Sequence, residues 1–156
     1  MKTFRPRGRR LALPILLFAS VVTSSAHDPG ISSTRLRMSS GFIVATMTLE
    51  NQDIAAVKAV GGGPDPFASA LSVTADGEPL PPLRVERSGD DGHHTRIDFQ
   101  FASPASASLA VTVNLLAALA RGHKHHLEVY DESGRLLVDG LLGAGAATLA
   151  IPRGPD

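Results

Sequence analysis

Short runs in which polar and apolar residues alternate recur along most of this chain, and turn-forming residues separate them. The clearest runs are Phe42–Leu49 and Thr95–Ala102, in which nearly every second side chain is apolar. A period of two residues is that of a strand with one buried face. Turn signals at spacings of about 8–12 residues are typical of β-sandwiches, and the pattern predicts an antiparallel, immunoglobulin-like β-sandwich of about 7–9 strands.

Turn-forming residues predict where these strands connect. Ser39-Ser40-Gly41 and Asp76-Gly77 predict tight hairpins, and Ser88–Gly92 and Ser133-Gly134 predict further turns. Three prolines, at positions 79, 81 and 82, place the arm Leu80–Val85 at the edge of a sheet, because proline cannot donate to a strand ladder.

The same reading predicts one or two short helices. Asn51-Gln52-Asp53 predicts a helix cap ahead of Ile54–Val60, and the glycines at positions 61–63 would end that helix. Asp65-Pro66 predicts a second helical turn over Phe67–Leu71. No internal repeat or second domain is visible, so we expect a single folded domain.

The first 26 residues are typical of an export signal. Five basic residues precede the apolar run Leu11–Val22, and the small residues Ser24 and Ala26 predict cleavage before His27. The apolar run is shorter than the roughly 20 residues that span a bilayer, although an uncleaved anchor is the alternative. We therefore expect a signal peptide at residues 1–26 and an exported domain at residues 27–156. That domain would be periplasmic or secreted, and not itself transmembrane.

Composition then narrows the function classes. Residues 27–156 contain 10 basic and 15 acidic residues, a net charge of −5 with histidine neutral. This balance argues against nucleic acid as a partner, since nucleic-acid-binding proteins carry a basic patch. The chain has no Cys, which excludes disulfides and thiolate metal sites. It also lacks a Gly-x-Ser-x-Gly elbow around Ser32 or Ser33, so a hydrolase is not predicted and we expect no enzyme.

Histidines supply the candidate site. Cleavage before His27 would place a free α-amine and an imidazole on one residue, and this pair can chelate a metal ion near neutral pH. About a hundred residues later, His123 and His125 would share one face of a strand, roughly 6–7 Å apart. We predict a divalent-metal site made of His27, His123, Asp28 and His125, and an imidazole site without thiolates suits copper, nickel or zinc.

A structural interpretation of the same histidines stays open. In it, one histidine packs within the fold and the others are solvated at a hairpin mouth. His126 would lie on the opposite face of the strand from His123, and no role is predicted for it. His93 and His94 follow two acidic residues at a predicted loop tip, where we expect solvated side chains.

Three segments resemble a family of exported domains. They are His27–Ser33, Leu119–Lys124 and Asp131–Arg135, and they are similar to the periplasmic N-terminal regions found ahead of HupE/UreJ-type membrane proteins. The resemblance implies a β-sandwich outside the membrane, a link to nickel or cobalt handling, and recurring positions at His27, Asp28, Gly122 and His123. This chain lacks the family's multi-helix membrane portion. The resemblance therefore implies, at most, a separately encoded membrane protein as partner.

More distantly, the chain resembles small copper-binding β-sandwiches of the CopC type, whose mature chains also begin with His. Three functions follow as expectations. The first is capture or delivery of a divalent metal by an exported, non-enzymatic domain. The second is a structural or interaction module of a membrane complex without bound metal. The third is a redox enzyme with a copper brace at its N-terminal histidine, against which the sparse aromatic residues argue.

Overall fold

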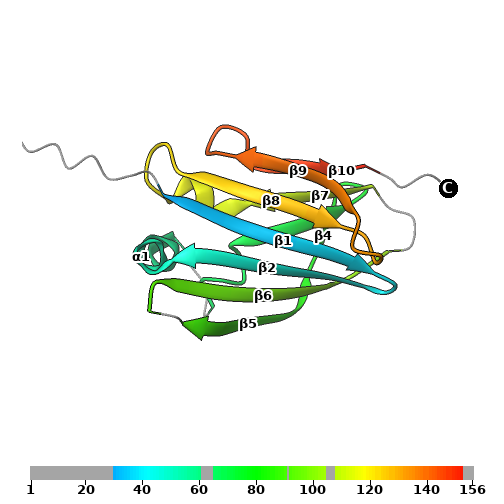
Figure 1. Ribbon diagram of the computed structural model, residues 1–156, viewed down its shortest axis with the longest axis horizontal. Helices are drawn as coiled ribbons and strands as arrows, with labels where there is room; N and C mark the ends of the chain where they lie inside the picture. The colour runs from blue at the N-terminus through cyan, green and yellow to red at the C-terminus, as the bar shows by residue number, and fades with distance from the viewer. Residues whose placement is uncertain (1–29, 61–64, 91, 105–107, 153–156) are drawn as a thin grey trace, which may run out of the picture.

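Two packed β-sheets make up this protein (Figure 1). The computed structural model describes residues 30–60, 65–90, 92–104 and 108–152. This part of the chain holds ten strands, one α-helix and one 3-10 helix, which confirms the predicted all-β sandwich. The ten strands exceed the predicted 7–9.

The larger sheet has six strands in the order β5-β6-β2-β1-β8-β9. Their bounds are β5 (Pro82–Asp90), β6 (His94–Ala102), β2 (Phe42–Glu50), β1 (Ile31–Ser39), β8 (Lys124–Tyr130) and β9 (Leu136–Leu142). The smaller sheet has the order β10-β7-β3-β4. Its strands are β10 (Thr148–Ile151), β7 (Leu109–Val113), β3 (Leu71–Ala75) and β4 (Glu78–Leu80). The helices are α1 (Asn51–Val60) and η1 (Asn114–Ala117).

The arm after the Asp76-Gly77 turn forms two strands where the sequence predicted one. β4 ends at Leu80 in the smaller sheet, and β5 begins at Pro82 in the larger sheet. The chain changes sheets at the Pro81-Pro82 step, because neither proline has an amide hydrogen to continue the first ladder. Both strands lie at the edge of their sheets, as the prolines predicted.

Three local predictions were wrong. The predicted turn at Ser88–Gly92 is largely strand, since β5 continues to Asp90 through a bulge. The predicted helical turn over Phe67–Leu71 is a non-helical turn in which Asp65 Oδ1 accepts a hydrogen bond from the Phe67 amide at 2.9 Å. Residues 51–53 are the first turn of α1 and do not precede it.

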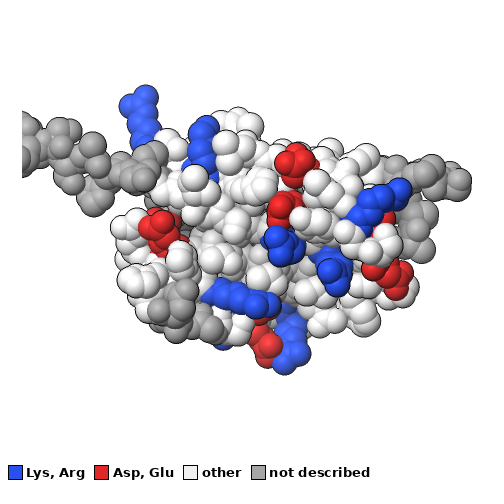
Figure 2. Space-filling model, viewed as in Figure 1, with Lys and Arg blue, Asp and Glu red and all other residues white. Residues whose placement is uncertain are grey.

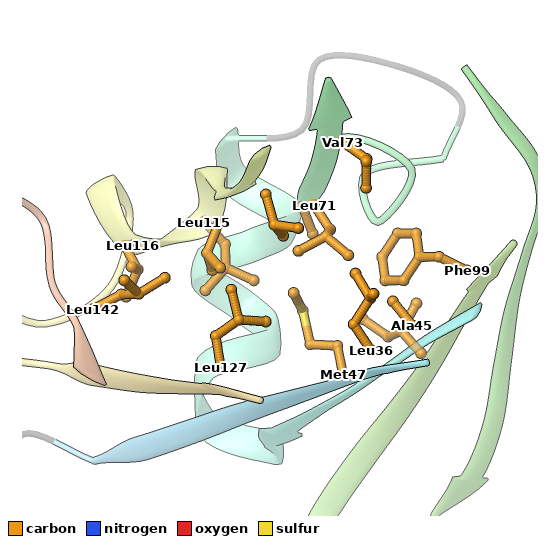
Figure 3. Packing of buried hydrophobic residues seen from close by; sticks show 14 of the residues in the cluster. Leu36, Ala45, Met47, Leu71, Val73, Phe99, Leu115, Leu116, Leu127 and Leu142 are labelled. Carbon is orange, nitrogen blue, oxygen red and sulfur yellow. The ribbon is translucent and has the colours of Figure 1, made fainter. Parts of the chain in front are cut away.

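The core lies between the two sheets (Figure 3). Leu36, Met47 and Leu127 point inward from the larger sheet toward Leu71 and Val73 of the smaller one, and all five are buried. Burying an aliphatic side chain of this size stabilises a fold by about 1.5–3 kcal/mol. The alternation read from the sequence thus selects which face of each strand enters the core.

One strand pairing departs from the antiparallel rule and positions the candidate site. β1 pairs antiparallel with β2 and parallel with β8, so the N-terminal ends of β1 and β8 lie together. In this register Ser32 is opposite His125 and Thr34 is opposite Leu127. The parallel pairing brings residues near the start of the domain beside the histidine cluster.

The outer face of the six-stranded sheet carries both basic and acidic side chains among uncharged residues (Figure 2). Charges of opposite sign come close together there: Arg35 lies 3.1 Å from Glu128. Among the described residues, no helix has the length and apolar character needed to cross a membrane.

Candidate functional site

All the described histidines lie at one end of the sandwich. β8 runs parallel to β1 and therefore begins at the same end. β6 also runs in the direction of β1, because β2 lies between them and is antiparallel to both. His93 and His94 stand at the start of β6, and the cluster at positions 123–126 stands at the start of β8. The helix α1 packs at this same end (Figure 1).

A tight turn delivers His123 to the start of β8. The His123 amide donates to the Ala120 carbonyl at 2.9 Å, and Gly122 has φ +93°. A turn of type II needs a positive φ at its third residue, and glycine adopts it without strain. The chain then continues into β8 with His123 and His125 buried and Lys124 exposed, which confirms the predicted alternation.

Four buried side chains form a continuous row of hydrogen bonds. The Ser32 Oγ lies 2.8 Å from His123 Nε2 and 2.7 Å from His125 Nδ1. The second ring nitrogen of His125, Nε2, lies 2.9 Å from Thr34 Oγ1. Each of these four residues is at most 3% exposed. Ser32 therefore bridges the two histidines, and Thr34 closes the far end of the row.

The environment of His125 holds its imidazole neutral. Burial, together with the nearby His123 and His126, lowers the pKa of His125 to about 4. A neutral imidazole has one N–H donor and one acceptor nitrogen. Both nitrogens of His125 contact hydroxyl groups, so a metal ion could use this residue only by displacing one of those hydrogen bonds.

His123 differs because one of its nitrogens has no partner. Nδ1 is buried and makes no hydrogen bond, and the same holds for Oδ2 of Asp53. The two atoms face each other at 3.8 Å, beyond hydrogen-bond distance. Buried polar atoms without a partner are uncommon in folded proteins, and an adjacent pair of them suggests a missing ligand.

Asp53 and Gly30 complete the surroundings of this pair. Asp53 lies in the first turn of α1, where the helix dipole favours a negative charge. Burial raises the pKa of its carboxyl, an effect that His123 opposes and Glu50 reinforces. Gly30 has φ +63°, and a Cβ there would lie 3.1 Å from His123 Nδ1 and 3.9 Å from Asp53 Oδ2. The glycine thus leaves space beside both unpartnered atoms.

This pair has the chemistry and spacing of two metal ligands. Metal–nitrogen and metal–oxygen bonds of about 2.0–2.2 Å allow two ligand atoms to be up to about 4.2 Å apart. The distance of 3.8 Å between His123 Nδ1 and Asp53 Oδ2 fits within that limit. However, no three His, Cys, Asp or Glu side chains of the described segments group closely enough to hold a metal ion by themselves. Any complete site needs a donor from elsewhere.

Two of the predicted ligands, His27 and Asp28, lie outside the described residues, and the predicted signal peptide does as well. Of the other two, the structure places His123 beside an unpartnered carboxylate and His125 within the hydrogen-bonded row. His123, just before β8, and His125, within it, therefore have different environments.

Ser32, His123 and Asp53 stand in the order of a serine-hydrolase triad. The serine bonds one ring nitrogen and the aspartate faces the other. Two features argue against that chemistry. Ser32 is only 2% exposed, and its Oγ is shared with a second imidazole. A nucleophile must reach its substrate, so this row is better suited to orienting His123 than to attacking a carbonyl group.

The remaining histidines are separate from this site. His93 and His94 are exposed beside Glu50, at a polar hollow of about 380 Å³. Two strands lie between β6 and β8, which separates the two histidine groups by roughly 14 Å at a strand spacing of about 4.8 Å. His126 lies on the outer face, 3.7 Å from Asp139.

Sequence reasoning missed Asp53, Ser32 and Thr34 as members of this site. Asp53 was interpreted as part of a helix cap, and its place in the first turn of α1 gives no local sign that it faces His123. The alternation of β1 could have indicated that Ser32 and Thr34 are buried, since they share a face with Leu36. Two hydroxyls on an inward face imply buried polar partners.

No protein-family model matches this chain, and no curated protein matches it either. The likeness to the domains ahead of HupE/UreJ-type proteins therefore stays a prediction that rests on the quoted residues.

Proposed function

We propose that this chain is an exported, non-enzymatic β-sandwich domain that binds one divalent metal ion. The proposed ligands are His123 through Nδ1, Asp53 through its carboxylate, and the amine and imidazole of His27 as the first residue of the mature chain. Asp28 would accept a hydrogen bond or add an oxygen ligand. Because both nitrogens of His125 are hydrogen-bonded, we leave it out of the ligand set.

One observation carries this proposal. Two buried atoms that can bind a metal ion, His123 Nδ1 and Asp53 Oδ2, lie 3.8 Å apart, and neither has a hydrogen-bond partner. Leaving buried polar groups unsatisfied costs about 1–3 kcal/mol each. A bound cation would satisfy both, since a carboxylate and a neutral imidazole nitrogen each offer it a lone pair. Gly30 leaves space beside both atoms and is the third residue after His27 in the sequence.

Covalent geometry allows His27 to supply the missing donors. His27 is three residues before Gly30, and three extended residues reach about 10 Å. A Cβ at Gly30 would lie 3.1 Å from His123 Nδ1, so the start of the mature chain is within reach of this atom. Histidine side chains and a chain amine favour copper, nickel or zinc over calcium or magnesium, which prefer all-oxygen sites.

Calorimetry on the chain beginning at His27 tests the proposal, with copper, nickel and zinc as separate titrants. We expect one ion bound per chain at micromolar concentration or below. Asp53→Asn keeps the shape of the side chain and removes its charge, and it should weaken binding at least 10-fold. His123→Ala should abolish the binding. A chain with one alanine added before His27 should also bind more weakly, because the amine moves away from the imidazole.

Two controls make the experiment specific. His126→Ala removes a histidine three positions after His123 on the outer face, and a double His93→Ala/His94→Ala variant removes the exposed pair; both should keep the affinity within about 2-fold. No binding by the unmodified chain would contradict the proposal. That outcome would favour the alternative function, an interaction module of a membrane complex in which His123 has only a structural role.

A further inference from the structure

We propose that Ser32, His125 and Thr34 form a relay that sets the proton position on His123, and that a cation at His123 Nδ1 reverses the relay. His125 would then change tautomer without touching the ion. This inference rests on the proposed metal site. Ser32, Thr34 and His125 are then positioning residues, because they act on His123 and do not bind the ion.

The hydrogen-bond count makes the row all-or-none. Ser32 is buried and lies within 2.8 Å of two ring nitrogens. Its one hydroxyl proton has an acceptor in this row only if Ser32 donates to one histidine and accepts from the other, and a buried hydroxyl proton without an acceptor is costly. His125 in its neutral form has one N–H and one lone pair, and both its nitrogens contact hydroxyl oxygens. Fixing the direction of one hydrogen bond therefore fixes all three.

Without a cation, Asp53 selects one direction. An ionised carboxylate 3.8 Å from Nδ1 favours the proton on that nitrogen, because the N–H dipole then points at the negative charge. Nε2 of His123 then accepts from the Ser32 hydroxyl. Ser32 accepts from Nδ1–H of His125, and Nε2 of His125 accepts from Thr34.

A cation at Nδ1 selects the other direction. The ion occupies the Nδ1 lone pair, so the neutral ring of His123 carries its proton on Nε2 and donates to Ser32. Ser32 must then donate to Nδ1 of His125, whose own proton moves to Nε2 and points at Thr34. Each of the four groups holds one proton before and after, so the reversal requires no net proton uptake or release by the row. A second-shell hydrogen bond of this type fixes the tautomer of a metal-binding histidine.

Nitrogen-15 spectroscopy of the imidazoles tests the relay directly. The chain beginning at His27, labelled in histidine, would be recorded at pH 8 with and without zinc, well above the ordinary pKa of histidine near 6.5. We expect both His123 and His125 to exchange tautomers when zinc is added, whereas His126 on the outer face keeps its pattern. A change at His123 with none at His125 would overturn the relay and leave the metal site intact. No change at any histidine would overturn both proposals.

Affinity gives a second test, at the far end of the row. Thr34→Val removes the hydroxyl and keeps the shape of the side chain, so the N–H that His125 must turn toward position 34 in the bound state loses its acceptor. Val leaves an unpaired nitrogen lone pair in the free state and an unpaired N–H in the bound state, and a buried N–H without an acceptor is the less tolerated of the two. We therefore expect zinc affinity to fall roughly 3- to 10-fold. Thr34→Ser should restore it. Equal zinc affinities for the folded Val and Ser variants would contradict the relay, because a purely structural hydroxyl alters stability and not affinity.

Discussion

The two faces of the β1–β8 strand pair carry polar networks of similar size in opposite environments. On the inner face, Ser32 and Thr34 hold His125 within a row that is almost fully buried. On the outer face, Arg35 lies 3.1 Å from Glu128 and 5.6 Å from the centre of the Tyr130 ring, and its side chain is 68% exposed.

The difference shows that burial, and not the number of contacts, decides what such a network contributes. Exposed charged groups are well solvated whether or not they are paired. An exposed ion pair therefore typically contributes only about 0–1 kcal/mol to the free energy of unfolding. Buried polar groups have no water to return to, so losing one partner leaves the other unsatisfied. A substitution of the buried His125 should therefore change stability far more than a substitution of His126, its partly exposed neighbour in the sequence.

Ser32→Ala should lower the free energy of unfolding by about 4 kcal/mol, because two buried ring nitrogens lose their partner at once. Urea unfolding monitored by circular dichroism measures the change. Ser33→Ala is the matched control, since Ser33 is the next residue and lies on the outer face. It should change stability by less than about 0.5 kcal/mol. Equal effects at the two serines would refute the contrast.

Acidification should weaken the fold through His125. Its pKa is about 4 in the folded protein against 6.5 ordinarily, so between these pH values the unfolded chain binds more protons than the folded one. Stability is therefore full above about pH 6.5 and decreases as the pH falls toward 4, by about 3 kcal/mol. Asp53, whose pKa is raised, acts in the opposite sense near pH 4.

Unfolding measured at several pH values between 4 and 8 shows this slope. His125→Gln should flatten it, and His126→Gln should leave it unchanged because His126 is solvated on the outer face. If the His125 variant retained the full slope, the buried histidine would not be its source.

Gly30→Ala tests the boundary where the inner face meets the candidate site. The substitution places a Cβ 3.1 Å from His123 Nδ1 and requires an alanine at φ +63°. We expect about 2 kcal/mol of destabilisation, of which about 1–2 kcal/mol is backbone strain, together with weaker metal binding. Gly41→Ala, at the other end of β1, imposes similar strain with nothing within 4 Å of the new Cβ. The control should therefore bind metal normally. Normal binding by the Gly30 variant would show that the space beside His123 is not needed.

Arg35→Ala should have the smallest effect. Because the side chain is largely exposed, we expect stability to fall by less than about 1 kcal/mol in low salt. In about 1 M salt, where screening acts within roughly 3 Å, the difference from the unmodified chain should nearly vanish. A large effect that persists in high salt would show that the outer network is as important as the inner one.

Sequence reasoning predicted the parts of this site that follow from local periodicity. A strand period of two residues placed His123 and His125 on the inner face with Leu127, and the structure confirms it. It could not separate the roles of the two histidines, because the residues that surround them come from β1 and α1. Ser32 is 91 residues from His123, and nothing near either residue specifies that β1 and β8 pair in parallel.

The strand count failed for a related reason. Pro81 and Pro82 correctly marked an edge, yet they also mark where the chain leaves one sheet for the other, which depends on how the sheets pack. Asp53 was missed because an acid at the start of a helix has an ordinary explanation there. In each case the outcome depends on contacts with residues that are distant in the sequence.

The parallel pairing of β1 with β8 also has a consequence for how this chain is made. Ser32 and His123 are 91 positions apart in the sequence. At a synthesis rate of about 5–20 residues per second, His123 is therefore added roughly 5–20 s after Ser32. During that interval β1 can pair with β2, but its other edge has no neighbour, although it ends up near the middle of the sheet. An open strand edge is a template for association with other chains. The nascent protein thus exposes the unpaired edge of β1, a site for association with other chains, until β8 emerges and pairs with it.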